Sequence, residues 1–284
     1  MRGPSAKWVG AVLMLAGCLV SGPLRAGGGW IREPGQGYVK LGLTAVGTTR
    51  YHTVLGQAVT TARFRQQVYS LYGEMGLLPR LEATLNFPVF RRAEFRAATP
   101  GRGVGDPEIG LRYGVLTGQW PLAVGVAVEA PVGNPNERGF NRQDPRIFIA
   151  LPTGDGEWNV WTRASLSHRL RKQPAYFTLN AGYNKRTEGF TDQYTYGAQV
   201  GYQVKGKAWL TANLLTLANT RAPNPDKPGS IGLGEGVAYS TAGLGVSYAL
   251  GKHWWATADW ATGFGTLRNV YSGSQFTAGV AVQW

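Results

Sequence analysis

The amino-acid sequence predicts an all-β protein, a transmembrane antiparallel up-and-down β-barrel of about twelve strands. Apolar and polar residues alternate with period two through most of the chain, which is the pattern of a β-strand with two unlike faces. Short connections alternate strictly with longer ones, as in outer-membrane barrels. Charged residues make up only 16% of the 284 residues, below the value of about 25% that is typical of soluble domains.

The N-terminus predicts a signal peptide over residues 1–26. Arg2 and Lys7 give it a positive start, and an apolar run over 8–20 follows. No later segment is apolar for the roughly 20 residues that a helical membrane span needs. Residues 27–284 therefore form one domain, which can enter a membrane only as an outer-membrane β-barrel.

The single cysteine, Cys18, lies inside this N-terminal segment. Cleavage near Ala26 would leave a mature chain without a thiol, a disulfide or a thiolate metal site. The sequence Leu15-Ala16-Gly17-Cys18 resembles a lipoprotein cleavage motif, so lipidation at Cys18 stays open as the alternative.

The predicted strands follow from the alternation. The last of them ends on the aromatic residue Trp284, and its apolar face resembles the C-terminal signal that the barrel-assembly machinery recognises. We therefore expect that machinery to be a partner of residues 273–284. The strands are expected at 37–47, 63–76, 81–95, 104–116, 120–132, 155–170, 174–186, 192–205, 207–220, 237–250, 252–266 and 273–284.

The connections between these strands predict the orientation of the barrel. Short turns fall at 78–80, 117–119, 171–173, 205–207 and 251–252, and longer loops fall between them. Short turns of outer-membrane barrels lie on the periplasmic rim, so an even strand count places both termini in the periplasm. The long connection 133–154 leaves open an additional hairpin or a segment that folds into the lumen.

Aromatic residues near the strand ends predict a girdle at the two membrane–water boundaries, where a ring is apolar and its polar atom reaches water. The residues expected there are Tyr38, Trp120, Trp158, Trp161, Tyr176, Trp254, Trp255, Trp260, Phe264 and Tyr271.

Charged residues at inward positions form a candidate site, because a charge inside a barrel requires a partner. We expect a structural network in which acids and arginines pair across the lumen, with a polar gate or selectivity ring as the alternative. The residues placed in the lumen by their parity are Glu74, Glu82, Glu108, Arg112, Glu129, Arg163, Arg169 and Asp259.

Basic residues concentrate on the long loops, and the formal net charge of the chain is +13. Arginine binds phosphate in a bidentate manner, so these residues predict contact with outer-membrane lipid, in particular lipopolysaccharide. Nucleic acid is not expected as a partner, because the chain has no recognition helix and no RNA-binding motif. The arginines singled out for lipopolysaccharide are Arg91, Arg92, Arg96, Arg138, Arg142 and Arg146.

Catalytic chemistry finds no support in the sequence. The three histidines, His52, His168 and His253, are scattered, and none is placed with a nucleophile on the outer face as an outer-membrane phospholipase would require. We therefore expect no catalytic residue, no metal site and no cofactor.

Residues 103–116 read Gly-Val-Gly-Asp-Pro-Glu-Ile-Gly-Leu-Arg-Tyr-Gly-Val-Leu, and 151–155 read Leu-Pro-Thr-Gly-Asp. These motifs resemble the outer-membrane transporter family of the phenol-degradation meta-pathway type, which is distantly similar to fatty-acid and hydrocarbon channel barrels. The resemblance implies uptake of small hydrophobic or aromatic molecules, and the motifs carry no substrate residue.

The expected function is passive passage of a small-molecule solute across the bacterial outer membrane. Pro88, Pro121 and Pro131 cannot donate to a β-ladder and mark candidate places for a plug or a lateral opening. The alternative is a non-transporting surface barrel that binds lipopolysaccharide or other partners through its loops.

Overall fold

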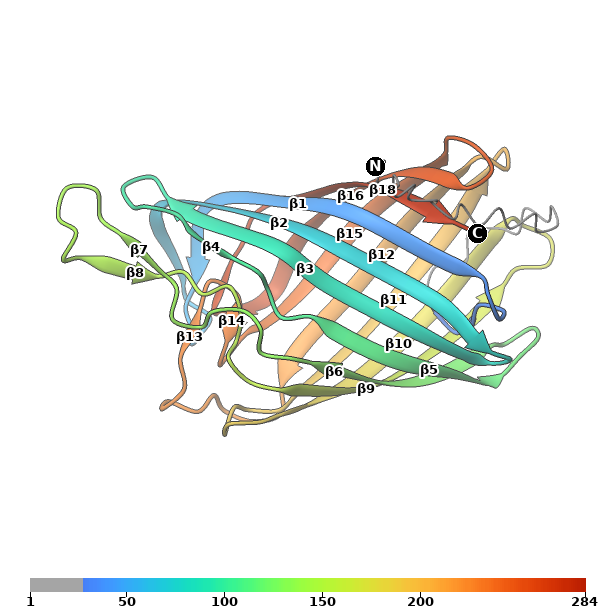
Figure 1. Cartoon of the computed structure of the whole chain (residues 1–284), viewed down its shortest axis with the longest axis horizontal. Helices are drawn as coiled ribbons and strands as arrows, with labels where there is room; N and C mark the ends of the chain where they lie inside the picture. The colour runs from blue at the N-terminus through green and yellow to red at the C-terminus, as the bar shows by residue number, and fades with distance from the viewer. Residues whose placement is uncertain (1–27) are drawn as a thin grey trace, which may run out of the picture.

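The structure is a computed structural model that describes residues 28–284, and it shows a closed antiparallel barrel of twelve strands (Figure 1). Neighbouring strands follow one another along the chain. The barrel closes where β18 (Gln275–Gln283) pairs with β1 (Gly37–His52) from Tyr38↔Gln283 to Val46↔Gln275. The predicted fold class and strand number are confirmed. The predicted signal peptide 1–26 and the question of Cys18 lie outside the described residues.

The barrel wall contains the long strands. The remaining short strands lie in the connections at one rim, and no helix in residues 28–284 is long and apolar enough to cross a membrane. The wall strands are β1, β2 (Ala58–Leu78), β3 (Leu81–Phe95), β5 (Glu108–Leu116), β6 (Leu122–Glu129), β9 (Asn159–Arg169), β10 (Ala175–Arg186), β11 (Gln193–Val204), β12 (Ala208–Asn219), β15 (Ala238–Ala249), β16 (Trp254–Arg268) and β18. The short strands are β4 (Gly101–Gly103), β7 (Arg138–Phe140), β8 (Phe148–Ala150), β13 (Gly229–Ser230), β14 (Leu233–Gly234) and β17 (Val270–Tyr271).

The two rims differ as the connections predict. Tight turns join the strands at one rim, and the turn between β11 and β12 shows why. Lys205 and Gly206 both have positive φ, 47° and 67°, and Lys207 N donates to Val204 O at 3.0 Å. This is the two-residue type I′ turn, whose twist matches that of a β-hairpin. The other rim has all the long connections.

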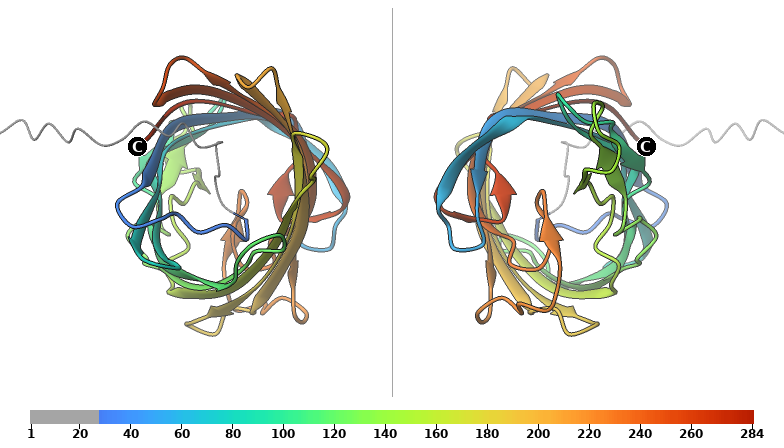
Figure 2. Two further views of the ribbon diagram at one scale, coloured as in Figure 1. Left: turned by 90° about the vertical axis from the view of Figure 1, so that its right-hand side faces the viewer. Right: turned by 90° about the vertical axis from the view of Figure 1, so that its left-hand side faces the viewer.

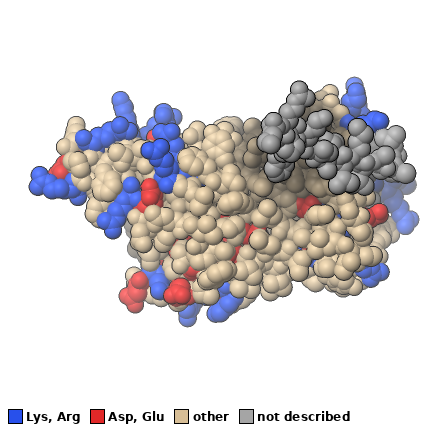
Figure 3. Space-filling view, viewed as in Figure 1, with Lys and Arg blue, Asp and Glu red and all other residues tan. Residues whose placement is uncertain are grey.

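The outer wall is apolar between the rims. Figure 3 shows lysine and arginine side chains gathered at the two ends of the visible face, with a largely uncharged surface between them. Lipid tails cannot solvate charge, so an uncharged belt is the surface that a barrel presents to a membrane. Large outward-facing side chains with more than half of their surface exposed include Leu41, Ile109, Leu111, Val126, Tyr196, Val200, Leu214, Leu244 and Phe276.

The aromatic girdle is only partly confirmed. Trp120, Trp158, Trp254 and Phe264 are exposed near the rims, whereas five residues expected with them lie on inward-facing positions. The prediction is wrong for Tyr38, Trp161, Tyr176, Trp255 and Tyr271. Rings pack inside the barrel because other side chains fill the lumen there.

An N-terminal segment, residues 28–36, lies inside the barrel near the rim of short turns (Figure 2). Gly29 N donates to Ser167 Oγ on β9 at 2.8 Å, and Arg32 Nε lies 2.8 Å from Glu74 Oε2 on β2. Trp30 packs edge-on against Tyr176 of β10, with ring centroids 5.5 Å apart. The segment therefore crosses the lumen, and it is a plug that the period-two pattern does not predict.

A second element enters the lumen from the opposite rim. The β13–β14 hairpin belongs to the connection between β12 and β15, and Figure 2 shows it within the barrel outline. Ile231 at its tip is buried in a cluster with Phe64, Phe95 and Leu151. This inward hairpin was also not predicted.

The connection 133–154 combines both alternatives that the sequence left open. Its middle forms the β7–β8 hairpin, which projects beyond the rim (Figure 1). Its last part returns to the barrel, where Leu151 is fully buried against Gly101.

Candidate functional site

The lumen has two unlike sides. Inward positions of β3, β5, β6 and β9 carry most of the charged side chains. Inward-facing side chains of β1, β15, β16 and β18 are mainly small or uncharged. The ion pair on this side joins Lys40 and Asp259, whose charged atoms lie 3.2 Å apart. The small inward residues on this second side include Gly42, Thr44, Gly243, Gly245, Ala261, Thr277 and Gly279.

The charged cluster near the rim of short turns holds the N-terminal plug. Arg112 NH1 lies 2.7 Å from Glu82 Oε1, and Arg32 N donates to Glu82 Oε2 at 3.0 Å. Arg32 also pairs with Glu74, which accepts a 2.6 Å hydrogen bond from Tyr72. Both acids are almost fully buried, and a buried carboxylate without these donors would be strongly unfavourable. Glu74, Glu82 and Arg112 of the expected set therefore meet here, and they are joined by Arg32, which strand parity does not place in the lumen.

In the middle of the lumen Arg163 binds Glu108 in a bidentate manner, with both N–O distances 2.6 Å. The Arg163 guanidinium also lies 4.6 Å from the centre of the Trp161 ring. A planar guanidinium held by two oxygens and a ring has little freedom to move. This pair fixes the spacing of β5 and β9 across the intervening β6.

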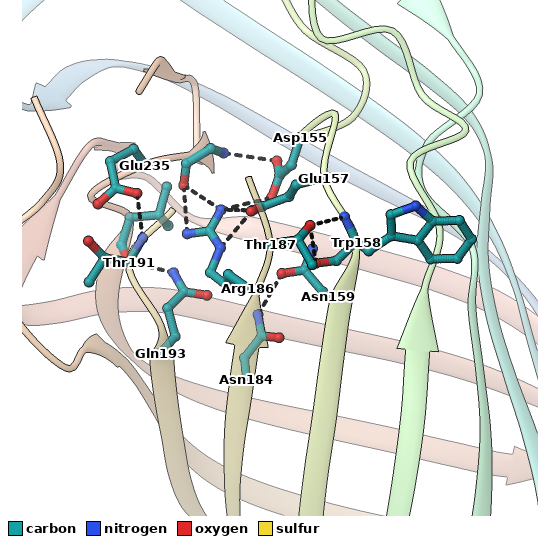
Figure 4. A network of polar contacts seen from close by, with 12 residues as sticks. Asp155, Glu157, Trp158, Asn159, Asn184, Arg186, Thr187, Thr191, Gln193 and Glu235 are labelled. Atoms are coloured by element: carbon teal, nitrogen blue, oxygen red, sulfur yellow. Dashed lines mark hydrogen bonds and ion pairs between the residues drawn. The ribbon is translucent and has the colours of Figure 1, made fainter. Parts of the chain in front are cut away.

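The hairpin in the other half of the lumen is anchored by Arg186 at the end of β10 (Figure 4). Arg186 is 4% exposed. Its Nε donates to Glu157 Oε1 at 2.6 Å, and its NH2 lies 3.5 Å from Asp155 Oδ2. Both terminal nitrogens donate to Gly234 O of β14 at 3.2 Å, and Gly234 N donates back to Asp155 Oδ1 at 2.8 Å. One arginine therefore connects the barrel wall to the hairpin.

Burial controls the protonation of these acids. Loss of hydration raises the pKa of Glu157 to about 8, although the Arg186 guanidinium opposes that shift. The pKa of Asp155 is raised for the same reason, again against the effect of Arg186. The hairpin anchor is thus sensitive to pH in the neutral and alkaline range.

Asn269 forms a second anchor for the hairpin. Its φ of 53° lies in the left-handed region that asparagine tolerates better than most residues. Asn269 Nδ2 donates to Glu235 O at 2.6 Å, and Asn269 O accepts from Gly232 N at 3.1 Å. The Glu235 carboxylate is buried and accepts from Thr191 N and Asn224 N, both at 2.9 Å.

Two predicted lumen residues depart from the expected pairing of acids with arginines. Glu129 accepts from Asn159 Nδ2 at 2.9 Å, and Asn159 accepts in turn from Asn184 Nδ2 at 2.8 Å. Arg169 is exposed at the end of β9 and forms no ion pair within residues 28–284. The pairing prediction is wrong for both, because neutral amides satisfy Glu129 and water reaches Arg169.

The residues of the hairpin anchor were missed, although a signal was present. Arg186 has the same parity as Asn184, so the alternation of β10 already directs it inward. Asp155 and Glu157 fall within the strand expected over 155–170, but β9 begins only at Asn159, so the loop and not strand parity directs these two side chains. Their partner Gly234 is on a loop whose position only the folded chain defines.

The arginines expected to contact lipopolysaccharide lie in different environments. Arg92 faces outward and pairs with Glu94 at 2.8 Å, and Arg96 is exposed in the following turn. Arg138, Arg142 and Arg146 belong to the projecting β7–β8 hairpin and its tip.

Arg91 contradicts the lipid-contact prediction. It pairs with inward-facing Val68, and its buried Nε has no hydrogen-bond partner among the described residues. The cause is a bulge in β3: Tyr69 pairs with Phe90, whereas Leu71 pairs with Phe87. One extra residue turns the following side chains to the other face of the sheet.

No family model and no curated protein matches the chain. Among solved structures, the fold is similar to the COG4313 outer membrane channel from Pseudomonas putida F1, with a TM-score of 0.66 and 15% identity over 92% of this chain and 100% of that one. It is also similar to the NanC porin, with a TM-score of 0.53 and 9% identity over 87% of this chain and 100% of that one. The KdgM porin gives a TM-score of 0.50 and 8% identity over 87% and 99%. The expected similarity to outer-membrane channel barrels is therefore confirmed at the level of the fold.

Proposed function

We propose that the protein is a passive channel for small, hydrophobic or aromatic molecules in the bacterial outer membrane. The observation that carries this proposal is that two separable elements occupy the lumen of a complete barrel. Residues 28–36 and the β13–β14 hairpin enter from opposite rims, and both are held largely by side chains of the wall. A barrel that served only as a scaffold would not need two segments from outside its wall to fill its lumen. The similarity to an outer membrane channel over the full length of that chain supports the same function.

An incomplete stretch of wall supports an apolar solute. β6 ends at Glu129 and β9 begins at Asn159, whereas β3 continues to Phe95. Above Glu129 the ladder narrows: Ala130 N donates to Pro107 O, Gly105 N donates to Pro88 O, and along this edge β3 then pairs only with the short strand β4. We propose that an apolar solute leaves the lumen sideways here, into the membrane.

The three prolines differ in their relation to this stretch of wall. Pro88 and Pro131 border it, and neither can donate a ladder bond. Pro121 lies near the other rim, where its carbonyl accepts from Ser167 N. Pro121 therefore belongs to the seat of the N-terminal plug and does not mark an opening.

Liposome swelling tests the function. Purified barrel in liposomes should admit benzyl alcohol faster than a sugar of similar size, and a variant with residues 229–234 replaced by two glycines should admit both faster. Protein-free liposomes and liposomes with heat-unfolded protein are the controls. Equal rates for the intact barrel, the variant and the protein-free liposomes would refute the channel.

The orientation proposed for the barrel places the tight-turn rim and both termini in the periplasm. A cysteine at Arg146, which is almost fully exposed, should react with a membrane-impermeant maleimide on intact cells. A cysteine at Lys172 on a tight turn should react only after the outer membrane is opened. The reverse pattern would invert the orientation.

A second candidate role is contact of the β7–β8 hairpin with lipopolysaccharide. Phe140 and Phe148 are about half exposed on one face of this hairpin, and the Arg138 guanidinium lies 4.2 Å from the Phe148 ring centre. Backbone bonds from Thr99 N to Phe140 O at 2.8 Å and from Arg142 N to Ala97 O at 3.0 Å hold the hairpin on the rim. Apolar rings beside arginines fit a phosphorylated lipid.

Binding of the intact barrel to vesicles that contain lipid A tests this role. Replacing Arg138, Arg142 and Arg146 with glutamine should weaken binding, and dephosphorylated lipid A should bind the unaltered protein equally weakly. Glutamine at Arg171 and Lys172 on the opposite rim is the matched control. Unchanged binding by the hairpin variant would remove this role.

A further inference from the structure

A pocket of about 730 Å³ opens on the long-loop rim, outside the hairpin that occupies the lumen. It lies between the loop that joins β1 to β2, the connection that carries the hairpin, and the end of β16. Its volume is within the range of about 300–1,000 Å³ that is usual for small-molecule sites. The lining residues that matter here are Tyr51, Val54, Leu55, Pro223, Lys227 and Arg268.

The walls of the pocket are apolar and held in place by contacts between the loops. Val54 packs on the backbone of Gly236, where an added Cβ would lie 2.8 Å from Val54 Cγ2. Gly236 has a φ of 73°, which a residue with a side chain rarely adopts. Leu55, at the loop tip, is 76% exposed. An exposed leucine beside a formed cavity gives an apolar ligand a hydrophobic surface on which to bind.

Two cations give the pocket its charge. Neither Lys227 nor Arg268 forms an ion pair with an acid in the part of the chain that the structure describes. The contact found for Lys227 is with the face of the Phe190 ring, at 5.5 Å.

The acids nearby cancel only part of this charge. Glu235 lines the pocket, but its carboxylate is buried and accepts the backbone N–H groups of Thr191 and Asn224. Asp226, the neighbour of Lys227 in sequence, is not a lining residue. Two cations and one acid therefore leave the lining of the pocket with a net positive charge.

We propose that this pocket binds a small organic acid and presents it to the channel. The apolar body of the ligand lies against Val54, Leu55 and Pro223, and its carboxylate lies between Lys227 and Arg268. The inference deepens the proposed function, since the pocket adjoins the hairpin that a solute must pass. It adds an acid anion with an apolar body as a class of solute, beside the uncharged apolar solutes for which the sideways exit is proposed.

Titration calorimetry on the purified full-length barrel tests the proposal with three probes. Benzoate combines a ring with a carboxylate, benzamide keeps the ring without the charge, and acetate keeps the charge without the ring. Benzoate should bind with saturation and more tightly than either of the others. Raising the salt concentration should weaken benzoate binding and leave benzamide unchanged, because salt screens only the charged contact.

Variants separate the charged contact from the apolar one. Lys227→Gln and Arg268→Gln should each weaken benzoate binding about fivefold, as expected for a partly exposed ion pair. Leu55→Ser should weaken benzoate and benzamide alike. Lys207→Gln and Lys252→Gln on the opposite rim are the matched controls, and heat-modifiable migration verifies that every variant is folded.

Unchanged benzoate binding in the Lys227→Gln/Arg268→Gln double variant would overturn the proposal. Equal affinity for benzamide and benzoate would overturn it as well, because the pocket would then select only the ring. Binding and flux are measured separately, so the two hypotheses fail separately. Benzoate binding without flux supports the pocket and refutes the channel, whereas flux without benzoate binding does the reverse.

Discussion

Replacement of Arg186 by methionine is expected to release the β13–β14 hairpin from the lumen. Arg186 is buried, and it is the side chain that joins Glu157 and Asp155 to Gly234 of the hairpin. Methionine has a similar length and no charge, so the wall of β10 keeps its packing. The change removes only the anchor.

The magnitude follows from the burial of the pair. Breaking a buried ion pair by removing one partner costs about 3–5 kcal/mol. The lower end, about 3 kcal/mol, applies here, because burial already raises the pKa of Glu157 to about 8 and so favours its neutral form over an unpaired buried charge. About 3 kcal/mol corresponds to a change of more than a hundredfold in the docking equilibrium of the hairpin. The ladders of the barrel do not involve the Arg186 side chain, so the barrel itself should stay folded.

Single-channel conductance and hydrogen exchange measure the release. The Arg186→Met variant should conduct more than the wild type, and amides 229–234 should exchange faster, while the barrel strands keep their protection. Arg171→Met on a tight turn is the matched control. Adding Glu157→Gln should restore part of the docking, because it removes the acid that was left without a partner.

Unchanged conductance together with unchanged exchange of residues 229–234 would refute this reasoning. The hairpin would then be held by Ile231 in its apolar cluster and by Asn269, and Arg186 would serve only to neutralise the buried acids.

Three further predictions concern pH, barrel closure and the N-terminal plug. Burial raises the pKa of Glu157 from 4.5 to about 8, so the docked hairpin binds this proton more tightly than the undocked one and loses stabilisation as the pH rises through that range. Conductance should therefore increase between pH 6 and 9. The Glu157→Gln variant, which has no titrating group there, should show a flatter dependence on pH. Gly37 pairs with Trp284 at the seam, and a Cβ on Gly37 would overlap the indole. Gly37→Ala should lower the yield of heat-modifiable barrel refolded in detergent, where no assembly machinery takes part, and adding Trp284→Ala should restore that yield. Deletion of residues 28–34 should raise conductance because the segment crosses the lumen, and equal conductance would show that the hairpin alone limits passage.

The sequence alone determined the wall of this protein. Side chains on a strand alternate strictly, so the pattern of β5, with Glu108 and Arg112 on one face and Ile109 and Leu111 on the other, already assigns a lumen side and a lipid side. Turn chemistry such as Lys205-Gly206 fixed where strands end. Both signals depend only on residues that are close together in the chain, so they can be recognised in a single sequence.

Tertiary structure alone decided what fills the barrel. Arg32 reaches Glu74 and Glu82 across the lumen, and Ile231 packs against Phe64 on a strand far away in sequence. The bulge in β3 reversed the direction of Arg91; Pro88 lies inside it, but a proline indicates only that a ladder bond is missing and not that one residue is added. These features depend on which distant segments meet inside a closed wall. The period-two pattern cannot predict these contacts, because it assigns each residue to a face of its strand and does not identify the segment that the face contacts.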